Sequence, residues 1–230
     1  MKKVFFNWSG GKDSSLAFYH ILKQKEFSIE YLLTNISAEH QRISMHGISL
    51  ELLKLQAESL DIPLETMSII KDATMEDYGK QVTDKMAFFT NKQISDCVFG
   101  DIFLEDLKTY RENQLKPLGI TAHFPLWKRP TSEIIKEFID LGFKAKVVSI
   151  NAKLLDQSFV GRELDQSFIN DLPDNVDVCG ENGEFHSFVY DGPIFKQPLP
   201  IKVGKIVKRE YKSDENSEWD TAFWFADLEL

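Results

Sequence analysis

The sequence predicts an α/β fold in which a doubly wound, mainly parallel sheet carries helices on both faces and is followed by a smaller C-terminal α+β domain. Three observations lead to this prediction. Short apolar runs alternate with helical patterns over residues 4–150, and turn residues separate them. Beyond Pro173 the pattern changes to alternating apolar and polar residues, as in antiparallel strands. The length of 230 residues fits one full domain and a smaller part, since a domain takes about 150 residues.

The first elements of the chain are a strand, a glycine turn and a helix. Val4-Phe5-Phe6 is a short apolar run that ends at Asn7, and apolar residues recur at helical spacing within residues 14–22. Further along we expect buried strands at residues 31–36, 66–70, 97–102 and 122–127 and helices at residues 46–60 and 78–90. Strands that alternate with helices in this way usually lie parallel in one sheet.

The C-terminal part mixes helices with alternating strands. We expect helices at residues 132–141 and 166–172 and strands at residues 144–150, 186–190, 202–212 and 219–225. The polar segment 213–218 separates the last two strands, which predicts an antiparallel hairpin. We therefore expect one domain over residues 1–130 and a second over residues 131–230. The aromatic strand from Trp219 to Phe225 packs within the monomer or forms the surface of a homodimer, and both remain open.

Composition and charge exclude several classes of protein. Hydrophobic residues make up 43% of the chain and charged residues 27%, which excludes disordered, collagen-like and coiled-coil proteins. The net charge of -9 disfavours a nucleic-acid partner, which would need a local basic patch. Two cysteines are too few for a disulfide framework and indicate a reducing compartment. No apolar run reaches the roughly 18 residues of a membrane span, and the first run is shorter than a signal-peptide core, so we expect a soluble cytoplasmic protein without a membrane partner.

The most informative segment runs from Ser9 to Ser15, between the first strand and the first helix. Gly10 and Gly11 allow a tight turn that exposes backbone N–H groups, and the helix dipole adds its positive end, so the loop can hold phosphate oxygens. Lys12 adds a positive charge, and Asp13 can cap the helix and help to position a metal ion. The alternative is a simple glycine turn with a solvated Lys–Asp pair. The spacing matches neither the Walker A pattern nor Gly-x-Gly-x-x-Gly.

Asp101 stands at the carboxyl end of a strand that we expect in the centre of the sheet, where open α/β sheets bind their ligands. Its carboxylate can hold a metal ion or a nucleophile that attacks a substrate, and the alternative is an N-cap for the following helix. Asp13 and Asp101 are thus the candidate Mg²⁺ ligands. Arg111 can pair with a phosphate or a substrate carboxylate, and the alternative is a solvated helical arginine beside Glu112.

A second candidate segment runs from Cys179 to His186 and carries two carboxylates among glycines. Glu181 and Glu184 can bind Mg²⁺ or an ammonium ion, and His186 can act as a general base. The alternatives are a glycine-rich connection whose carboxylates cap or face solvent, a Cys179–His186 nucleophilic pair, and a zinc site. Zinc is disfavoured because only two candidate ligands occur and no Cys-x-x-Cys pair accompanies them. His46, at the start of an expected helix, is a weaker candidate.

The segment Ser9 to Ser14 resembles the PP-loop of the adenine nucleotide alpha-hydrolase superfamily, whose members split ATP into AMP and pyrophosphate while they adenylate a substrate. The resemblance implies a HUP-like fold and ATP as cofactor, with Mg²⁺ to balance the charge on the departing pyrophosphate. It implies that the phosphates are bound by Ser9, Gly10, Gly11, Lys12, Asp13 and Ser14. It places adenine against the backbone near Asn7 and at Asn35-Ile36-Ser37.

Two later segments select a family within that superfamily. Phe99-Gly100-Asp101-Ile102 followed by Tyr110-Arg111-Glu112, and Cys179 to His186 followed by Asp191-Gly192-Pro193, resemble the two signatures of the diphthine–ammonia ligase (diphthamide synthase) family. The resemblance implies a ligase that adenylates a carboxylate, releases pyrophosphate and lets ammonia displace AMP. It implies Lys12, Asp101, Glu184 and His186 as catalytic residues. It implies substrate contacts by Arg111, Cys179, Gly180, Glu181 and Glu184.

One departure from the family pattern concerns the substrate. Family members expected to act on diphthine often carry a cysteine soon after the Arg-Glu of the middle signature, whereas Gln114-Leu115-Lys116-Pro117 contains none. The chain resembles the variant of the family that occurs in bacteria. Diphthamide belongs to archaeal and eukaryotic elongation factor 2, so a bacterial source would leave the reaction type but remove that substrate.

Two other functions remain open at the level of sequence. A PP-loop enzyme that modifies tRNA is the first, although the acidic charge and the lack of a catalytic cysteine pair or a zinc ribbon speak against it. A nucleotide-binding regulatory module that does not turn over is the second, and the presence of Lys12 and Asp101 speaks against it. Release of pyrophosphate that depends on a carboxylate, rather than on tRNA, would distinguish the ligase from both.

Overall fold

The computed structural model describes residues 1–43, 47–70, 74–211 and 221–230. These residues divide into two compact units. The N-terminal unit holds Met1–Ile43 and Ser49–Arg129, and the C-terminal unit holds Pro130–Leu230 together with Gly47 and Ile48. Each unit contains a sheet of its own.

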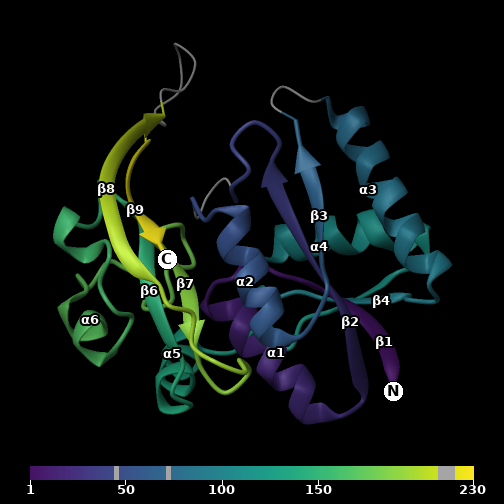
Figure 1. Ribbon diagram of the computed structural model, residues 1–230, viewed down its shortest axis with the longest axis horizontal. Helices are drawn as coiled ribbons and strands as arrows, with labels where there is room; N and C mark the ends of the chain where they lie inside the picture. Colours follow the sequence, from purple (N-terminus) through teal and green to yellow (C-terminus); the bar gives the residue numbers. More distant parts are fainter. Residues whose placement is uncertain (44–46, 71–73, 212–220) are drawn as a thin grey trace. The chain divides into compact units, whose positions relative to one another are not determined.

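The N-terminal unit is built on five parallel strands (Figure 1). The strands are β1 (Lys2–Asn7), β2 (Phe27–Ser37), β3 (Leu64–Ile69), β4 (Asp96–Val98) and β5 (Thr121–His123). Their order in the sheet is β3-β2-β1-β4-β5, so the chain first moves outward from β1 to β3 and then returns to the other side of β1. The predicted doubly wound parallel sheet is confirmed, and its switch point lies between β1 and β4.

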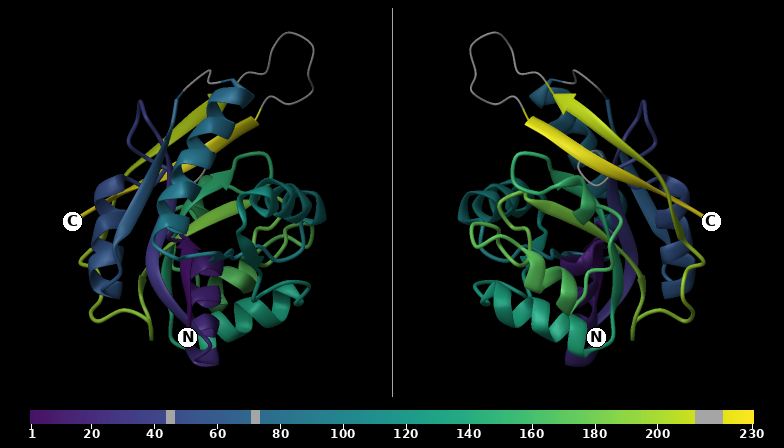
Figure 2. Two further views of the ribbon diagram at one scale, coloured as in Figure 1. Left: turned by 90° about the vertical axis from the view of Figure 1, so that its right-hand side faces the viewer. Right: turned by 90° about the vertical axis from the view of Figure 1, so that its left-hand side faces the viewer.

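Helices cover both faces of this sheet. They are α1 (Lys12–Gln24), α2 (Leu50–Leu60), α3 (Met75–Asn91) and α4 (Glu105–Leu115), with a short 3-10 turn at Lys116–Leu118. Figure 2 shows α2 and α3 on opposite sides of β3. Successive side chains of β1 point to opposite faces of the sheet, so β1 contributes to the apolar packing on both faces. Phe6 contacts Phe18 of α1, while Phe5 stacks on Phe89 of α3 with ring centres 4.1 Å apart.

Two strands are shorter than the sequence indicates. The apolar runs predicted strands at residues 97–102 and 122–127, but β4 ends at Val98 and β5 ends at His123. After β4, the chain turns toward the start of α1, and Gly100 lies against its backbone. After β5, a turn begins at Pro125, which has no N–H group to continue a ladder. The start expected for the second helix, at His46, lies outside the described residues, and α2 begins after its N-cap Ser49.

The C-terminal unit is α+β. Its elements are α5 (Thr131–Asp140), β6 (Lys144–Asn151), a 3-10 turn (Gln157–Phe159), α6 (Gln166–Asp171), β7 (Phe185–Asp191), β8 (Lys202–Tyr211) and β9 (Thr221–Glu229). The four strands form an antiparallel sheet in the order β7-β6-β9-β8, and β8 pairs with β9 as the predicted hairpin. The part of the last predicted strand before Thr221 lies outside the described residues. The helices in the described ranges include none with the length and apolar character needed to span a membrane.

Candidate active site

Two loops of the N-terminal unit meet at the carboxyl end of its sheet, one after β1 and one after β4. A Cβ atom at Gly100 would lie 2.9 Å from the backbone N of Ser14 and 3.0 Å from the carbonyl carbon of Asp13. The ends of the two strands are also tied, because Asn7 Nδ2 donates to the carbonyl oxygen of Val98 at 3.1 Å. Ligands of open α/β sheets bind at such a switch point. The structure therefore brings the two N-terminal motifs of the sequence to one place.

The hydroxyl groups of Ser9 and Ser14 make hydrogen bonds within the loop after β1. Ser9 Oγ donates to Ser14 Oγ at 3.1 Å, and Ser14 Oγ donates to the carbonyl oxygen of Gly11 at 2.9 Å. Gly10 has a φ of 75°, a left-handed conformation that glycine adopts without strain. Gly11 is the N-cap of α1 and supplies no side-chain hydrogen bond to the helix. The first turn of α1 thus has N–H groups that its N-cap side chain does not satisfy, which suits an anion.

Lys12 and Asp13 form an ion pair in the first turn of α1, with Nζ and Oδ2 2.7 Å apart. Lys12 is only 5% exposed. Burial raises the pKa of the Asp13 carboxyl, the Lys12 ammonium pulls this pKa down, and the charge of Asp101 pushes it up again. Asp13 Oδ1 is buried and finds no hydrogen-bond partner among the described residues. Asp13 does not act as the N-cap of α1, since that position belongs to Gly11. The solvated pair that the sequence left open is also wrong, because Lys12 is buried.

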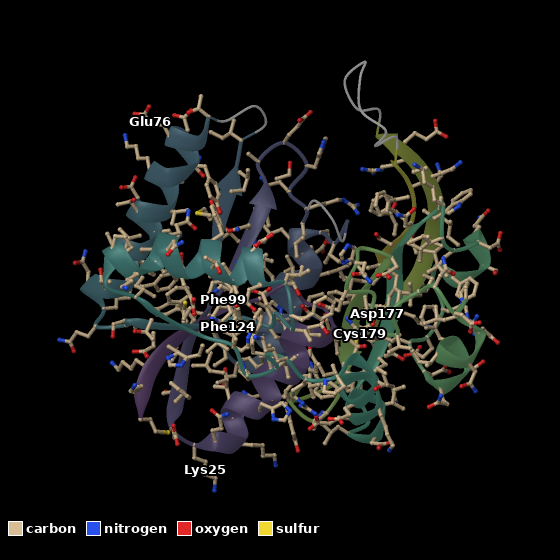
Figure 3. The ribbon with its side chains drawn as sticks, turned by 180° about the vertical axis from the view of Figure 1, so that it is seen from behind. Lys25, Glu76, Phe99, Phe124, Asp177 and Cys179 are labelled. Atoms are coloured by element: carbon tan, nitrogen blue, oxygen red, sulfur yellow. The ribbon has the colours of Figure 1, made fainter. Side chains whose placement is uncertain are left out.

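Asp101 pairs with Arg111 of α4. Arg111 Nε lies 2.7 Å from Asp101 Oδ2, and Arg111 Nη2 donates to Asp101 Oδ1 at 3.3 Å. The guanidinium also lies 4.2 Å from the ring centre of Phe99. Phe99 stacks on Phe124, and Figure 3 labels these two side chains next to each other. An N-cap role for Asp101 is wrong, because α4 begins at Glu105, and a solvated Arg111 is wrong as well. Contact of Arg111 with a phosphate or a substrate carboxylate stays a prediction.

Gln56 of α2 is a component of the site that the sequence analysis missed. Its side chain is fully buried, accepts from Trp8 Nε1 at 2.9 Å and donates to the carbonyl oxygen of Gly10 at 3.0 Å. Thr34 Oγ1 in turn donates to the carbonyl oxygen of Trp8 at 2.6 Å. A polar residue at a position where α2 presents its apolar face was the available signal. The hydrogen bond from Gln56 to the Gly10 carbonyl oxygen thus fixes the glycine turn after β1.

Replacing Gln56 with Leu is expected to lower the free energy of unfolding by about 1–3 kcal/mol, because Trp8 Nε1 and the Gly10 carbonyl would be buried without this partner. Urea denaturation followed by tryptophan fluorescence measures the change. Glu58→Leu, an exposed position on the same helix, is the matched control and should stay within about 0.5 kcal/mol of the wild type. Equal stability of the two variants would show that Gln56 does not support the loop.

The residues expected near adenine lie at the end of β2. Asn35 is exposed, and Ser37 Oγ accepts a hydrogen bond from the backbone N of His40 at 3.2 Å. Both belong to β2, which neighbours β1 in the sheet. Their contact with adenine stays a prediction.

The segment from Asp177 to Glu184 is a loop of the C-terminal unit that two carboxylates organise. Glu184 is 2% exposed, and its oxygens accept from the backbone N of Asp177 at 3.0 Å and from the backbone N of Asn182 at 2.8 Å. Asp177, which the sequence analysis did not single out, accepts from the backbone N of Cys179 at 2.9 Å. Glu184 thus has a structural role in this loop, and the catalytic role assigned to it stays a prediction.

Cys179 is fully buried, and its Sγ donates to the carbonyl oxygen of Thr131 at 3.2 Å. A buried thiol that is already engaged is a poor nucleophile. The residues that the structure describes contain no group of three or more His, Cys, Asp or Glu side chains placed to hold a metal ion. His186 lies in β7 opposite Ser149 of β6. Its role as a base, and substrate contacts by Gly180 and Glu181, stay predictions.

Comparison with known protein families shows to which family the chain belongs. The diphthamide synthase N-terminal domain model matches residues 1–122, and the diphthamide synthase C-terminal domain model matches residues 130–229. The chain belongs to the diphthamide synthase family. The two matches cover both signatures of this family that the sequence carries, at Asp101 and at Glu184.

Relatives of this diphthamide synthase family member include proteins named diphthine–ammonia ligase. The human protein is 26% identical over 183 residues, which cover 73% of this chain and 67% of the human one. The Schizosaccharomyces pombe protein is 24% identical over an alignment of 233 residues, gaps included, and this alignment covers 93% of this chain and 38% of the yeast one. The chain therefore spans about two thirds of the human relative and well under half of the yeast one. A solved structure described as a "predicted subunit of tRNA methyltransferase" from Methanocaldococcus jannaschii covers 68% of this chain at 16% identity, with a TM-score of 0.40.

Proposed function

We propose that this chain is an ATP-dependent ligase that joins ammonia to a carboxylate. In the first half of the reaction, a carboxylate oxygen attacks the α-phosphorus of ATP, the bond to the bridging oxygen breaks, and pyrophosphate leaves. In the second half, the nitrogen of ammonia attacks the acyl carbon, AMP departs with the electrons of the C–O bond, and the nitrogen loses a proton. Adenylation is needed because a free carboxylate is a poor acyl donor.

The observation that carries the proposal is the close approach of Gly100 to the backbone of Asp13 and Ser14. It brings Asp101 beside the loop that carries Lys12. At that position the negative charge of Asp101 contributes to raising the pKa of the Asp13 carboxyl. Lys12 and the N-terminus of α1 would stabilise the negative charge that develops on pyrophosphate.

We also propose that Mg²⁺ takes part. Mg²⁺ prefers oxygen ligands and is usually bound by one or two carboxylates together with substrate phosphates. Asp13 and Asp101 supply such a pair, and Asp13 Oδ1 is buried without a partner among the described residues, so these side chains fit the ion. Bound Mg²⁺ would neutralise charge on the phosphates. Asp13 would hold it, and Lys12, released from Asp13, would then face the phosphates.

A thermal-shift series tests the Mg²⁺ site without any turnover. Mg²⁺ added with a non-hydrolysable ATP analogue should stabilise the wild type by about 2.7 kcal/mol at 100 times its dissociation constant, beyond the analogue alone. Asp13→Asn should lose this increment, and Asp84→Asn, an exposed position on α3, should keep it. A raised pKa means that the folded chain holds the Asp13 proton to higher pH than the unfolded chain, so the Mg²⁺ increment should shrink as pH falls through that raised pKa. An unchanged increment in Asp13→Asn would exclude this ligand.

The second half-reaction is assigned to the segment Cys179 to His186 by the same family resemblance. In this proposal Glu181 attracts the ammonium ion, and His186 accepts the proton that the attacking nitrogen loses. Diphthine on elongation factor 2 is the first carboxylate to test, because the relatives are named for it. A cytoplasmic location and a homodimer stay predictions of the sequence.

Pyrophosphate release from ATP and Mg²⁺ tests the proposal. Candidate carboxylates are offered one at a time: diphthine-bearing elongation factor 2 from yeast that lacks its own ligase, free amino acids, and short acidic peptides. We expect release only with a carboxylate. Release that requires tRNA instead would identify a tRNA-modifying enzyme and reject the ligase.

A further inference from the structure

The loop from Asp177 to Glu184 has no helix or strand, yet its backbone is closely satisfied. Gly180 N donates to the carbonyl oxygen of Asp177 at 2.9 Å, and Gly183 N donates to the carbonyl oxygen of Gly180 at 3.2 Å. Gly180 has a φ of 73°, and a Cβ there would lie 2.7 Å from the carbonyl oxygen of Phe185. The loop is therefore folded tightly against the start of β7.

Asp177 connects this loop to the start of α5. Its Oδ1 accepts from the backbone N of Cys179 at 2.9 Å and from the backbone N of Glu181 at 3.4 Å, while its Oδ2 accepts from Thr131 Oγ1 at 2.7 Å. Cys179 Sγ makes a second link, to the carbonyl oxygen of Thr131. Thr131 is the first residue of α5 and lies 46 positions away in the sequence. Figure 3 shows Asp177 and Cys179 side by side.

We propose that Asp177 is a positioning residue for the amide-forming half of the reaction. It does so by fixing the backbone of Cys179 and Glu181 to α5. This sets where the loop presents Glu181 and where the chain enters β7, whose second residue is His186. The inference rests on the proposed function. It adds a residue that no signature of the family resemblance contains, and it assigns to Asp177 hydrogen-bond acceptance rather than charge or substrate contact.

The conservative variant separates acceptance from charge. In Asp177→Asn, Oδ1 can still accept from the two backbone N–H groups, and Nδ2 can donate to Thr131 Oγ1, because a hydroxyl oxygen also accepts. Asp177→Ala removes all of these bonds. Thr131→Val removes only the side-chain hydrogen bond from Thr131 to Asp177, leaves the bond from Cys179 Sγ to the Thr131 carbonyl oxygen, and should have a milder effect in the same direction. Asp174→Ala is the matched control, since Asp174 is exposed three residues earlier.

The experiment follows the two half-reactions separately. The wild type and each variant are given diphthine-bearing elongation factor 2, ATP and Mg²⁺; exchange of labelled pyrophosphate into ATP reports adenylation, and an ammonium titration reports amide formation. In Asp177→Ala, exchange should stay within about threefold of the wild type. Amide formation at low ammonium should fall about 100-fold, mainly through a higher KM for ammonium, as expected when a reacting group is misplaced by about 1 Å. Asp177→Asn should recover to within about fivefold, and Asp174→Ala should match the wild type.

Three results would overturn the proposal. They are wild-type amide formation in Asp177→Ala, an Asp177→Asn variant as impaired as Asp177→Ala, and loss of both half-reactions together with a lower Tm. Hydrogen exchange of the backbone over residues 177–184 gives a readout that needs no substrate: faster exchange in Asp177→Ala but not in Asp177→Asn supports the positioning role, and equal exchange overturns it. If the wild type makes no amide from this substrate or from the other candidate carboxylates, the proposed function fails, while the hydrogen-exchange comparison still decides whether Asp177 fixes the loop.

Discussion

Lys12→Ala should reduce carboxylate-dependent pyrophosphate release by about 100- to 1,000-fold, the usual effect of removing one group that stabilises developing negative charge. The expectation follows from the position of Lys12 in the first turn of α1, next to Asp13 and beside the loop that carries Asp101. A pyrophosphate assay over a range of ATP concentrations measures the change. Most of the loss should be in kcat, because the charge on the leaving pyrophosphate grows in the transition state.

The matched control is Lys23→Ala, which removes a lysine from the exposed last turn of the same helix. It should retain nearly full activity. Lys12 is buried against Asp13, so its loss changes the local charge balance and folding must be checked. Circular dichroism spectra and Tm values of both variants provide this check. Unchanged ATP binding and turnover in Lys12→Ala would mean that the phosphate site lies elsewhere.

Gly100→Ala should lower both stability and activity. The three atoms nearest to the added Cβ would all be backbone atoms, at 2.9 Å for Ser14 N, 3.0 Å for the Asp13 carbonyl carbon and 3.1 Å for the Asp13 carbonyl oxygen. Backbone cannot swing aside as a flexible side chain does, so the loop after β1 must move. We expect a loss of about 1–3 kcal/mol in the free energy of unfolding. Because displaced catalytic groups lose efficiency steeply, kcat/KM for ATP should fall about 100-fold.

Gly79→Ala offers the matched control for this substitution. Gly79 lies within α3, and nothing described lies within 4 Å of a Cβ placed there. Alanine in a helix interior is favoured over glycine, so this variant should gain about 0.5–1 kcal/mol without a change in activity. Guanidinium denaturation of the two variants, side by side with the pyrophosphate assay, measures both effects. If Gly100→Ala behaved like Gly79→Ala, the close approach of the two loops would not matter for function.

The sequence was sufficient for the architecture and for the place of the first motif. Apolar runs separated by turn residues gave the order of strands and helices, because burial on both faces of a parallel sheet leaves a strong signal. It overestimated β4 and β5, since an apolar run does not show that the chain leaves the sheet at Gly100 or at Pro125. Local pattern carries no information on such tertiary approaches.

The hydrogen-bond and ion-pair partners of the polar side chains could mostly not be predicted from the sequence. Asp101 looked like a helix cap or a free ligand and instead pairs with Arg111, ten positions away on the next helix. Gln56 and Asp177 attracted no notice because their partners, Gly10 and Thr131, each lie 46 positions away along the chain. The catalytic role of Glu184 stays a prediction, but the sequence did not show that its oxygens also hold the loop in which it lies. Hydrogen-bond partners of buried polar groups depend on the complete fold.

Amide formation is the most direct measurement of the central claim. The wild type is incubated with ATP, Mg²⁺, isotope-labelled ammonium and diphthine-bearing elongation factor 2 from yeast that lacks its own ligase, and label in the protein amide is followed together with AMP and pyrophosphate. We predict one AMP and one pyrophosphate for each labelled amide, and a reduction of all three products by about 100- to 1,000-fold with Lys12→Ala. Release of ADP and phosphate, or AMP and pyrophosphate that appear only when tRNA is added, would contradict a carboxylate–ammonia ligase.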